Sequence, residues 1–193
     1  MNNFESLINQ VKAFSELSAE EEQMINRYFR HETHPKNAII LNTGEICHKL
    51  YFLNKGLLRT FHINQNGSEF TRLFCPENRF CTILISFTGN VPSAASIQCL
   101  EECELFSITF EDFKIFLSKS VNAQNIYTKI LEEYQNFQIH RIEFLTSYTP
   151  QEKVDIFMKE HKNLLQRLTD KIIVTYLQIT PETYSRSKKK LLH

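Results

Sequence analysis

The C-terminal residues 169–191 carry the side chains with the clearest chemistry in this chain. Thr180 is a good N-cap and Pro181 suits a first helical position, so a helix is expected to start sharply there. This helix presents polar and basic side chains to solvent: Glu182, Thr183, Ser185, Arg186, Lys188, Lys189 and Lys190. The element before it has apolar residues at helical spacing: Ile172, Ile173, Tyr176 and Leu177. A helix, a short turn and a capped basic helix predict a helix-turn-helix.

The segment YLQITPETYSR, residues 176–186, resembles the recognition segment of the Crp/Fnr superfamily of bacterial transcription regulators. In that family a turn is followed by E-T-x-S-R, and its Glu, Ser and Arg reach base edges in the major groove. The resemblance therefore implies that Glu182, Ser185 and Arg186 read bases. Glu can accept from a cytosine amino group, and Arg can donate twice to a guanine. Phosphate contacts are expected from Thr180, Thr183, Lys188, Lys189 and Lys190.

Some features favour other interpretations of this segment. Val174 stands where the family usually has a small residue, and Gln178 stands where it usually has a turn glycine with positive φ. The β-hairpin wing of longer family members does not follow Leu191, so the helix-turn-helix is expected to work without it unless the chain is a truncation. The alternatives are a plain surface hairpin with solvated lysines, or a ligand-binding β-roll module whose DNA-binding domain is vestigial.

Composition places the 193-residue chain among globular proteins, with 42% hydrophobic and 23% charged residues. Residues 1–149 hold 13 Lys and Arg against 17 Asp and Glu, whereas residues 150–193 hold 9 against 5. A basic C-terminal part on an acidic body is expected of a DNA reader with a separate sensor. A long apolar run and a signal-peptide pattern are both lacking, which predicts a cytoplasmic protein without a membrane partner.

The middle of the chain has the pattern of an antiparallel β-roll. Short apolar or alternating runs cover residues 38–41, 49–53, 57–63, 69–75, 95–100 and 104–109. Asn66-Gly67 predicts a two-residue hairpin loop between two of them. The pattern G-E-x(5)-YF-x(3)-G, at Gly44, Glu45, Tyr51, Phe52 and Gly56, resembles the cyclic-nucleotide-binding β-roll of the same superfamily. The predicted fold is α+β: an N-terminal jelly-roll type of β-roll with flanking helices, a long dimerisation helix and a C-terminal helix-turn-helix without a full wing.

The ligand cassette of that roll departs from the family pattern. Where nucleotide-binding members have a Gly-Glu pair for the ribose, alignment places Thr82 and Ile83, and where they have Arg-Ser for the phosphate it places Ser93 and Ala94. A cyclic phosphate needs a cation, which Ser93 lacks, and nothing in the sequence aims nearby Arg79 at the pocket. We therefore expect no cyclic AMP binding in the usual mode. The roll is expected either to bind an unknown small-molecule effector or to serve only as a scaffold. A pocket would also include Tyr127, Leu131 and Tyr134 of the following helix.

Residues 123–147 predict one long helix that is apolar on two faces. One apolar stripe contains Ile126, Ile130, Tyr134, Phe137 and Phe144. Such a helix needs two partners, its own roll and a second copy of itself, although a wholly intramolecular helix is the alternative. A homodimer would present two recognition helices about 34 Å apart to a two-fold symmetric operator on double-stranded DNA. The resemblance also implies RNA polymerase as a partner. Thr149-Pro150 marks a hinge, so the expected domains are residues 1–120, 121–148 and 149–193.

The positions of the histidines and cysteines, the residues that would bind a metal, disfavour an enzyme such as a cupin-like metal oxygenase on a similar roll. His48 and His62 are the histidines of the strand-rich region, and no H-x-H pair accompanies them. His31 and His34 fit exposed strand positions better than a metal pair. The five cysteines form no C-x-x-C pair. We therefore predict no catalytic residue, no metal ligand and no cofactor.

Overall fold

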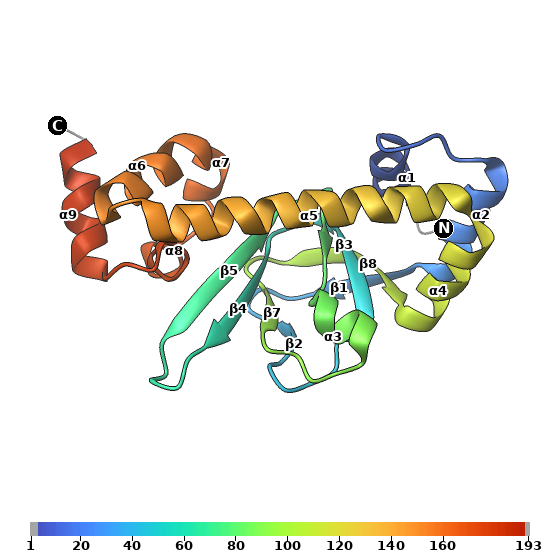
Figure 1. Ribbon diagram of the computed structural model, residues 1–193, viewed down its shortest axis with the longest axis horizontal. Helices are drawn as coiled ribbons and strands as arrows, with labels where there is room; N and C mark the ends of the chain where they lie inside the picture. The colour runs from blue at the N-terminus through green and yellow to red at the C-terminus, as the bar shows by residue number, and fades with distance from the viewer. Residues whose placement is uncertain (1–3, 192–193) are drawn as a thin grey trace. The chain divides into compact units, whose positions relative to one another are not determined.

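The computed structural model describes residues 4–191 (Figure 1). The chain forms two compact units. The first consists of Met1–His62 and Arg72–Leu131, and the second of Ile63–Thr71 and Glu132–His193. The second unit therefore includes the end of a β-hairpin whose strands begin in the first, and a single long helix runs through both units.

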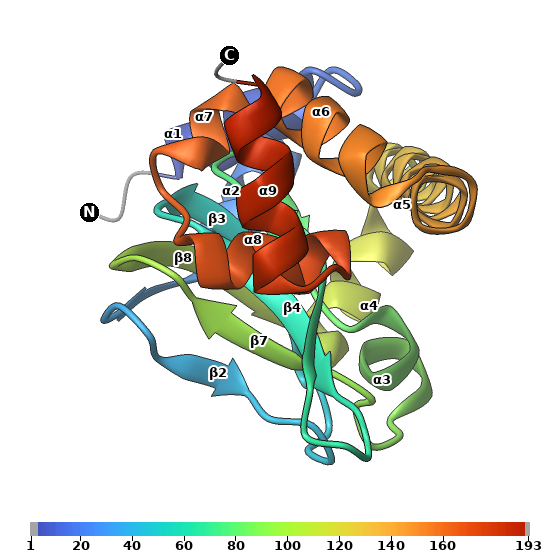
Figure 2. The same ribbon diagram turned by 90° about the vertical axis from the view of Figure 1, so that its left-hand side faces the viewer.

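The first unit contains two antiparallel sheets after a pair of helices, α1 (Glu5–Lys12) and α2 (Ala19–Tyr28). One sheet has the order β1-β8-β3-β6, and the other has the order β2-β7-β4-β5. The strands are β1 (Arg30–His34), β2 (Ile39–Leu41), β3 (Lys49–Lys55), β4 (Leu58–Ile63), β5 (Glu69–Cys75), β6 (Phe80–Cys81), β7 (Ser96–Cys99) and β8 (Cys103–Thr109). The sheets form two layers, as the β-roll prediction requires (Figure 2).

The remaining elements are helical. They are α3 (Leu84–Gly89), α4 (Phe110–Lys119), α5 (Val121–Ser147), α6 (Pro150–Glu160), α7 (Lys162–Leu165), α8 (Asp170–Leu177) and α9 (Pro181–Leu191). The hinge predicted at Thr149-Pro150 coincides with the start of α6, where Thr149 and Glu152 form a capping box around the first turn. Among the described residues, no helix combines the length and the apolar character that crossing a membrane requires.

Strand alternation explains why both faces of the β1-β8-β3-β6 sheet are buried. On β8, Phe106 turns to one face, where the Phe4 ring packs against it at 4.7 Å between centroids. Its neighbours Leu105 and Ser107 turn to the other face, and both are buried. Four consecutive residues of β8, Leu105–Ile108, are buried, so both faces of this strand are covered.

The structure confirms the predicted fold class and adds details that the sequence did not indicate. Strand β6 and helix α3 were not predicted, because they are only two and six residues long. The β4–β5 hairpin forms as expected, but its loop is longer than the predicted two residues. Gly67 donates to the Asn64 carbonyl and has a φ of 77°, while Asn64 donates to the Ser68 carbonyl. This is a three-residue loop with glycine in the left-handed position.

Gly56, between β3 and β4, provides a test of the packing. Its φ is +101°, and a Cβ added there would lie 2.5 Å from the Glu102 carbonyl oxygen and 2.8 Å from Cys103 Sγ. We expect Gly56→Ala to destabilise the protein by at least about 2 kcal/mol, because the backbone strain at positive φ adds to the steric overlap of the new Cβ. Gly44 has a φ of +89° with nothing within 4 Å of an added Cβ. As the control, Gly44→Ala should cost only about 1 kcal/mol. Urea unfolding compares them, and equal losses would contradict the close approach at Gly56.

Candidate nucleic-acid interface and effector site

Helices α8 and α9 form a helix-turn-helix in the second unit (Figure 2). The hydroxyl of Thr169 accepts from the Ile172 amide and starts α8. The helix ends at Gln178, which adopts the left-handed conformation, with a φ of 53° and a ψ of 48°. Thr180 then starts α9, because its hydroxyl accepts from the Thr183 amide at 3.2 Å. A three-residue connection between two capped helices thus fixes where the second helix begins.

The inner side of this pair is a small apolar core. Tyr184 of α9 is 2% exposed, and Ile173 and Leu177 of α8 are fully buried. Val174 is buried as well, at 8% exposure, so the unit accommodates this larger residue. The positive φ of Gln178 is the conformation that usually calls for glycine, and the sequence therefore identified a strained position correctly.

The outer side of α9 exposes most of the predicted DNA-binding residues. Glu182, Ser185 and Arg186 are all exposed and lie within four residues of one another on the first turns of the helix. Arg186 donates through Nε to the Glu182 carbonyl at 3.4 Å, which aligns its side chain along the helix. Lys189 and Lys190 are exposed as well, whereas Thr183 is half-buried. This surface offers one carboxylate acceptor, hydroxyl groups and several cations.

Lys188 differs from its neighbours because it has a partner within the unit. Its Nζ lies 3.1 and 3.3 Å from the two carboxylate oxygens of Asp170, the first residue of α8. Burial, reinforced by the negative charge of Asp170, raises the pKa of Tyr184 to about 12. Because Lys188 pairs with Asp170, its predicted phosphate contact would compete with an ion pair that links α8 to α9.

The hydroxyl groups of the cassette between β6 and β7 form hydrogen bonds to backbone carbonyls. The buried hydroxyl of Ser93 donates to the Ala95 carbonyl at 2.6 Å and accepts from the Ala95 amide at 3.2 Å. Thr82 donates to the Lys49 carbonyl at 3.0 Å. Ser86, which the sequence analysis did not single out, donates to the Val91 carbonyl at 2.6 Å. The hydroxyls of Ser86 and Ser93 thus bind the backbone of the cassette, and the hydroxyl of Thr82 joins the cassette to β3.

The other residues predicted for the pocket differ in exposure. Ile83 is half-buried and packs against the core of the first unit, whereas Ala94 and Arg79 are exposed. On α5, Tyr127 contacts Phe113 with 5.1 Å between ring centroids, and Leu131 is half-buried. Tyr134 belongs to the second unit and is 38% exposed.

Comparison with known proteins agrees with this architecture. Residues 31–120 match the family model of the cyclic nucleotide-binding domain. A protein assigned to the Crp/Fnr family of transcriptional regulators, from Eubacterium rectale, has a TM-score of 0.77 at 18% identity, over 95% of this chain and 88% of that chain. The chain has the Crp/Fnr fold. FixK2 from Bradyrhizobium japonicum has a TM-score of 0.75 at 14% identity, over 84% of each chain.

A further structure with the Crp/Fnr fold is CLP from Xanthomonas campestris, a c-di-GMP responsive global regulator. It has a TM-score of 0.75 at 13% identity, over 91% of this chain and 92% of that chain. No curated protein sequence matches the chain significantly. Within residues 4–191, no group of three or more His, Cys, Asp or Glu side chains is arranged to hold a metal ion.

In this Crp/Fnr fold, the residues predicted for the dimer helix have different surroundings. Ile126 is 5% exposed in the core of the first unit, and Ile130 packs against that core. Phe137 is half-buried, and Phe144 contacts Tyr176 with 6.2 Å between ring centroids. Of the predicted stripe, only Tyr134 is exposed. The exposed apolar residues of α5 are Val121, Tyr134, Ile139 and Ile142.

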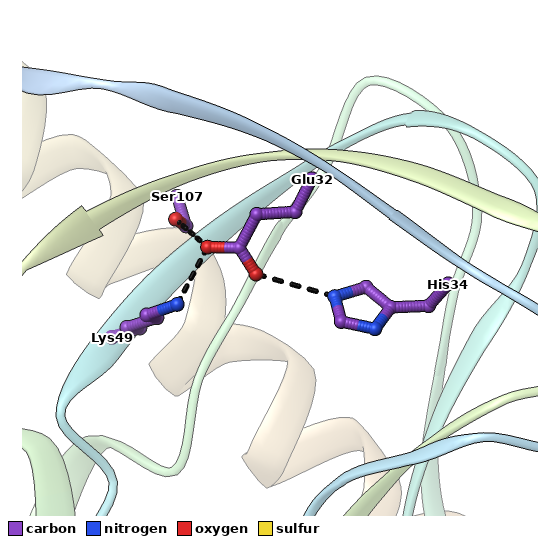
Figure 3. Close-up of polar contacts among 4 residues, drawn as sticks. All are labelled: Glu32, His34, Lys49 and Ser107. Atoms are coloured by element: carbon purple, nitrogen blue, oxygen red, sulfur yellow. Dashed lines mark hydrogen bonds and ion pairs between the residues drawn. The ribbon is translucent and has the colours of Figure 1, made fainter.

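A polar cluster in the first unit was missed by the sequence analysis (Figure 3). The Glu32 carboxylate on β1 accepts hydrogen bonds from Lys49 at 2.6 Å and from Ser107, and lies 3.2 Å from His34 Nε2. Glu32 and His34 occupy positions i and i+2 of one strand and so share a face, which is the signal that could have found the pair. Burial alone would raise the pKa of Glu32, but the hydrogen bonds of its three neighbours outweigh burial and lower it.

The lowered pKa of Glu32 predicts a pH dependence of stability. The carboxylate stabilises the fold above the ordinary Glu pKa of about 4.3, and this contribution is lost as the pH falls through the lower folded-state pKa. We expect Glu32→Gln to lower the thermal midpoint at pH 7, with a difference from the wild type that shrinks toward pH 3. Glu132→Gln, at an exposed position on α5, is the control. A difference for Glu32→Gln that is independent of pH would contradict the role of the charge.

Proposed function

We propose that this protein is a sequence-specific, DNA-binding transcription regulator that acts as a homodimer. The observation that carries the proposal is the exposed outer side of α9, where Glu182, Ser185 and Arg186 stand on a capped helix within a Crp/Fnr fold. A helix that enters the major groove reads bases with the side chains of its first turns, which is where these three residues lie. Such a role belongs in the cytoplasm, as the sequence predicts.

The charges of α9 divide the expected contacts into two classes. Arg186 can donate two hydrogen bonds to guanine, and Glu182 can accept one from cytosine, so these residues would discriminate between bases. Lys189 and Lys190 lie further along the helix and would contact phosphates, which adds affinity without reading sequence. Lys188 would contribute less, because Asp170 already pairs with it.

The experiment that tests the proposal is selection of bound sequences from a random duplex pool by the purified protein, at two salt concentrations. A two-fold symmetric motif with half-sites one helical turn apart would support the dimeric regulator and identify its operator. Weak binding that ignores sequence and disappears with added salt would favour the alternative, a ligand-binding roll with a vestigial DNA-binding domain.

Substitutions on α9 separate base reading from phosphate contact. Arg186→Ala should weaken operator binding by about 1–3 kcal/mol and relax specificity at one base pair. Lys189→Ala should weaken binding to all sequences similarly and reduce the slope of affinity against salt by about 1. Fluorescence anisotropy with operator and scrambled duplexes measures both. If Arg186→Ala lost affinity equally for both duplexes, Arg186 would not be a base-reading residue.

The homodimer proposal rests on the exposed apolar side chains of α5. Ile139 is 54% exposed and Ile142 is 63% exposed, three residues apart and therefore neighbours on the helix surface. A second copy of α5 would bury both side chains, as pairing of two helices through exposed apolar residues requires.

Ile142→Glu tests this interface. A buried carboxylate on the seam should shift the protein toward monomer, because each copy would lose its own apolar contact and face a like charge. His140→Glu places the same charge at an exposed position about 160° away from Ile142 around the helix and should leave the dimer unchanged. Sedimentation velocity measures both variants. An unchanged mass for Ile142→Glu would exclude this stripe as the interface.

The cassette supports the further proposal that cyclic AMP is not bound in the usual mode. The hydroxyl of Ser93 is 2.6 Å from the Ala95 carbonyl and is engaged with its own backbone, and it carries no charge for a phosphate. An effector that binds elsewhere in the roll remains compatible with this arrangement. RNA polymerase remains a prediction from the resemblance.

A further inference from the structure

Arg141 of α5 has surroundings that are unusual for a guanidinium. It is 6% exposed and lies within the second unit. Its Nη2 donates to the carbonyl of Tyr176 on α8 and, at 3.3 Å, to the carbonyl of Thr71 on β5. Its Cζ also stacks 3.8 Å from the centre of the Tyr176 ring. The Arg141 side chain thus joins three elements that are distant in sequence.

The charge of Arg141 is not neutralised by the described part of the chain, where no carboxylate contacts it. The titratable groups that its charge reaches are cationic or neutral: Lys153 of α6, His161 after α6, and Tyr176. Burial lowers the pKa of Arg141. Among the described residues, its buried Nη1 has no hydrogen-bond partner.

Stability alone does not account for such a residue. A buried charge costs several kcal/mol of desolvation, and apolar side chains of similar volume often stabilise a protein equally well or better. What a guanidinium adds is direction, because the two N–H bonds of Nη2 lie in the rigid guanidinium plane and point at two acceptors at once. Here the acceptors are two backbone carbonyls, one on the helix-turn-helix and one on the hairpin.

The Tyr176 carbonyl is close to the start of the turn that leads to the recognition helix. It precedes Gln178 by two residues, and the Gln178 and Ile179 amides both return to the Val174 carbonyl. A cation at this end of α8 also opposes the negative end of the helix dipole. One residue earlier, the Thr175 hydroxyl lies 2.7 Å from the Thr71 hydroxyl. Two adjacent residues of α8 are therefore held by α5 and β5.

We propose that Arg141 is a positioning residue for sequence reading. It fixes the C-terminal end of α8 and thereby the place at which α9 enters the groove, and the β4–β5 hairpin takes part through Thr71. The inference rests on the proposed DNA-binding function. It adds a buried residue, which cannot itself touch DNA, to those that determine specificity.

Arg141→Met tests the proposal because it keeps the apolar stem and removes the fork. We expect a thermal midpoint close to that of the wild type, unchanged binding to scrambled duplex, and about tenfold to hundredfold weaker operator binding. Arg141→Lys should restore little, because an ammonium on a flexible stem does not reproduce the fork. Operator binding equal to that of the wild type in Arg141→Met would overturn the proposal.

A second measurement needs no DNA. Amide hydrogen exchange at Gln178, Ile179 and Thr180 should accelerate in Arg141→Met, while exchange in β3 and β8 of the first unit stays unchanged. Thr71→Val, which removes one hydroxyl of the other contact, should accelerate the same amides to a smaller extent. Unchanged exchange in Arg141→Met would overturn the positioning role. If the wild type selects no operator, the proposed function fails, and the exchange result still decides whether Arg141 fixes the turn.

Discussion

The continuity of α5 is the constraint on which the rest of the structure depends. One 27-residue helix contributes to the cores of both units, so its sequence must satisfy two different environments. Ala123 and Ile126 in its first part are buried in the core of the first unit, whereas Arg141 in its second part is buried in the other. The remaining surface exposes Ile139 and Ile142, and apolar side chains left over in this way are available to a second copy.

The second unit is ordered without a large core. Residues 132–191 have few fully buried side chains, chiefly Val154, Phe157, Ile173, Leu177 and Tyr184. Caps at Thr149, Thr169 and Thr180 supply hydrogen bonds to three helix starts, and each cap contributes about 1 kcal/mol. Helix α9 is therefore held mainly by its capped start and by Tyr184, while its outer side carries polar groups.

The first unit contains the segment that matches the cyclic nucleotide-binding domain, and its cassette is held by internal contacts. Hydroxyls of Ser86 and Ser93 bind backbone carbonyls of the cassette, and the Phe87 ring packs on Phe110 and Phe113. These contacts stabilise the segment. The polar cluster of Glu32, Lys49, Ser107 and His34 lies in the sheet β1-β8-β3-β6, where the other three side chains all contact the Glu32 carboxylate (Figure 3).

The sequence by itself determined the features that depend on neighbouring residues. Thr180-Pro181 specified a helix start, alternation specified the strands, and Gln178 marked a position of positive φ, because capping, pleating and turn geometry act over a few residues. Only the tertiary structure decided which face of α5 is covered, because Ile126 and Ile142 are equally apolar and differ only in what packs against them. It also decided that Lys188 meets Asp170, that Glu32 gathers three partners, and that Arg141 joins Thr71 to Tyr176. Contacts between distant elements depend on packing, and a single sequence does not record which of its polar residues packing will bring together.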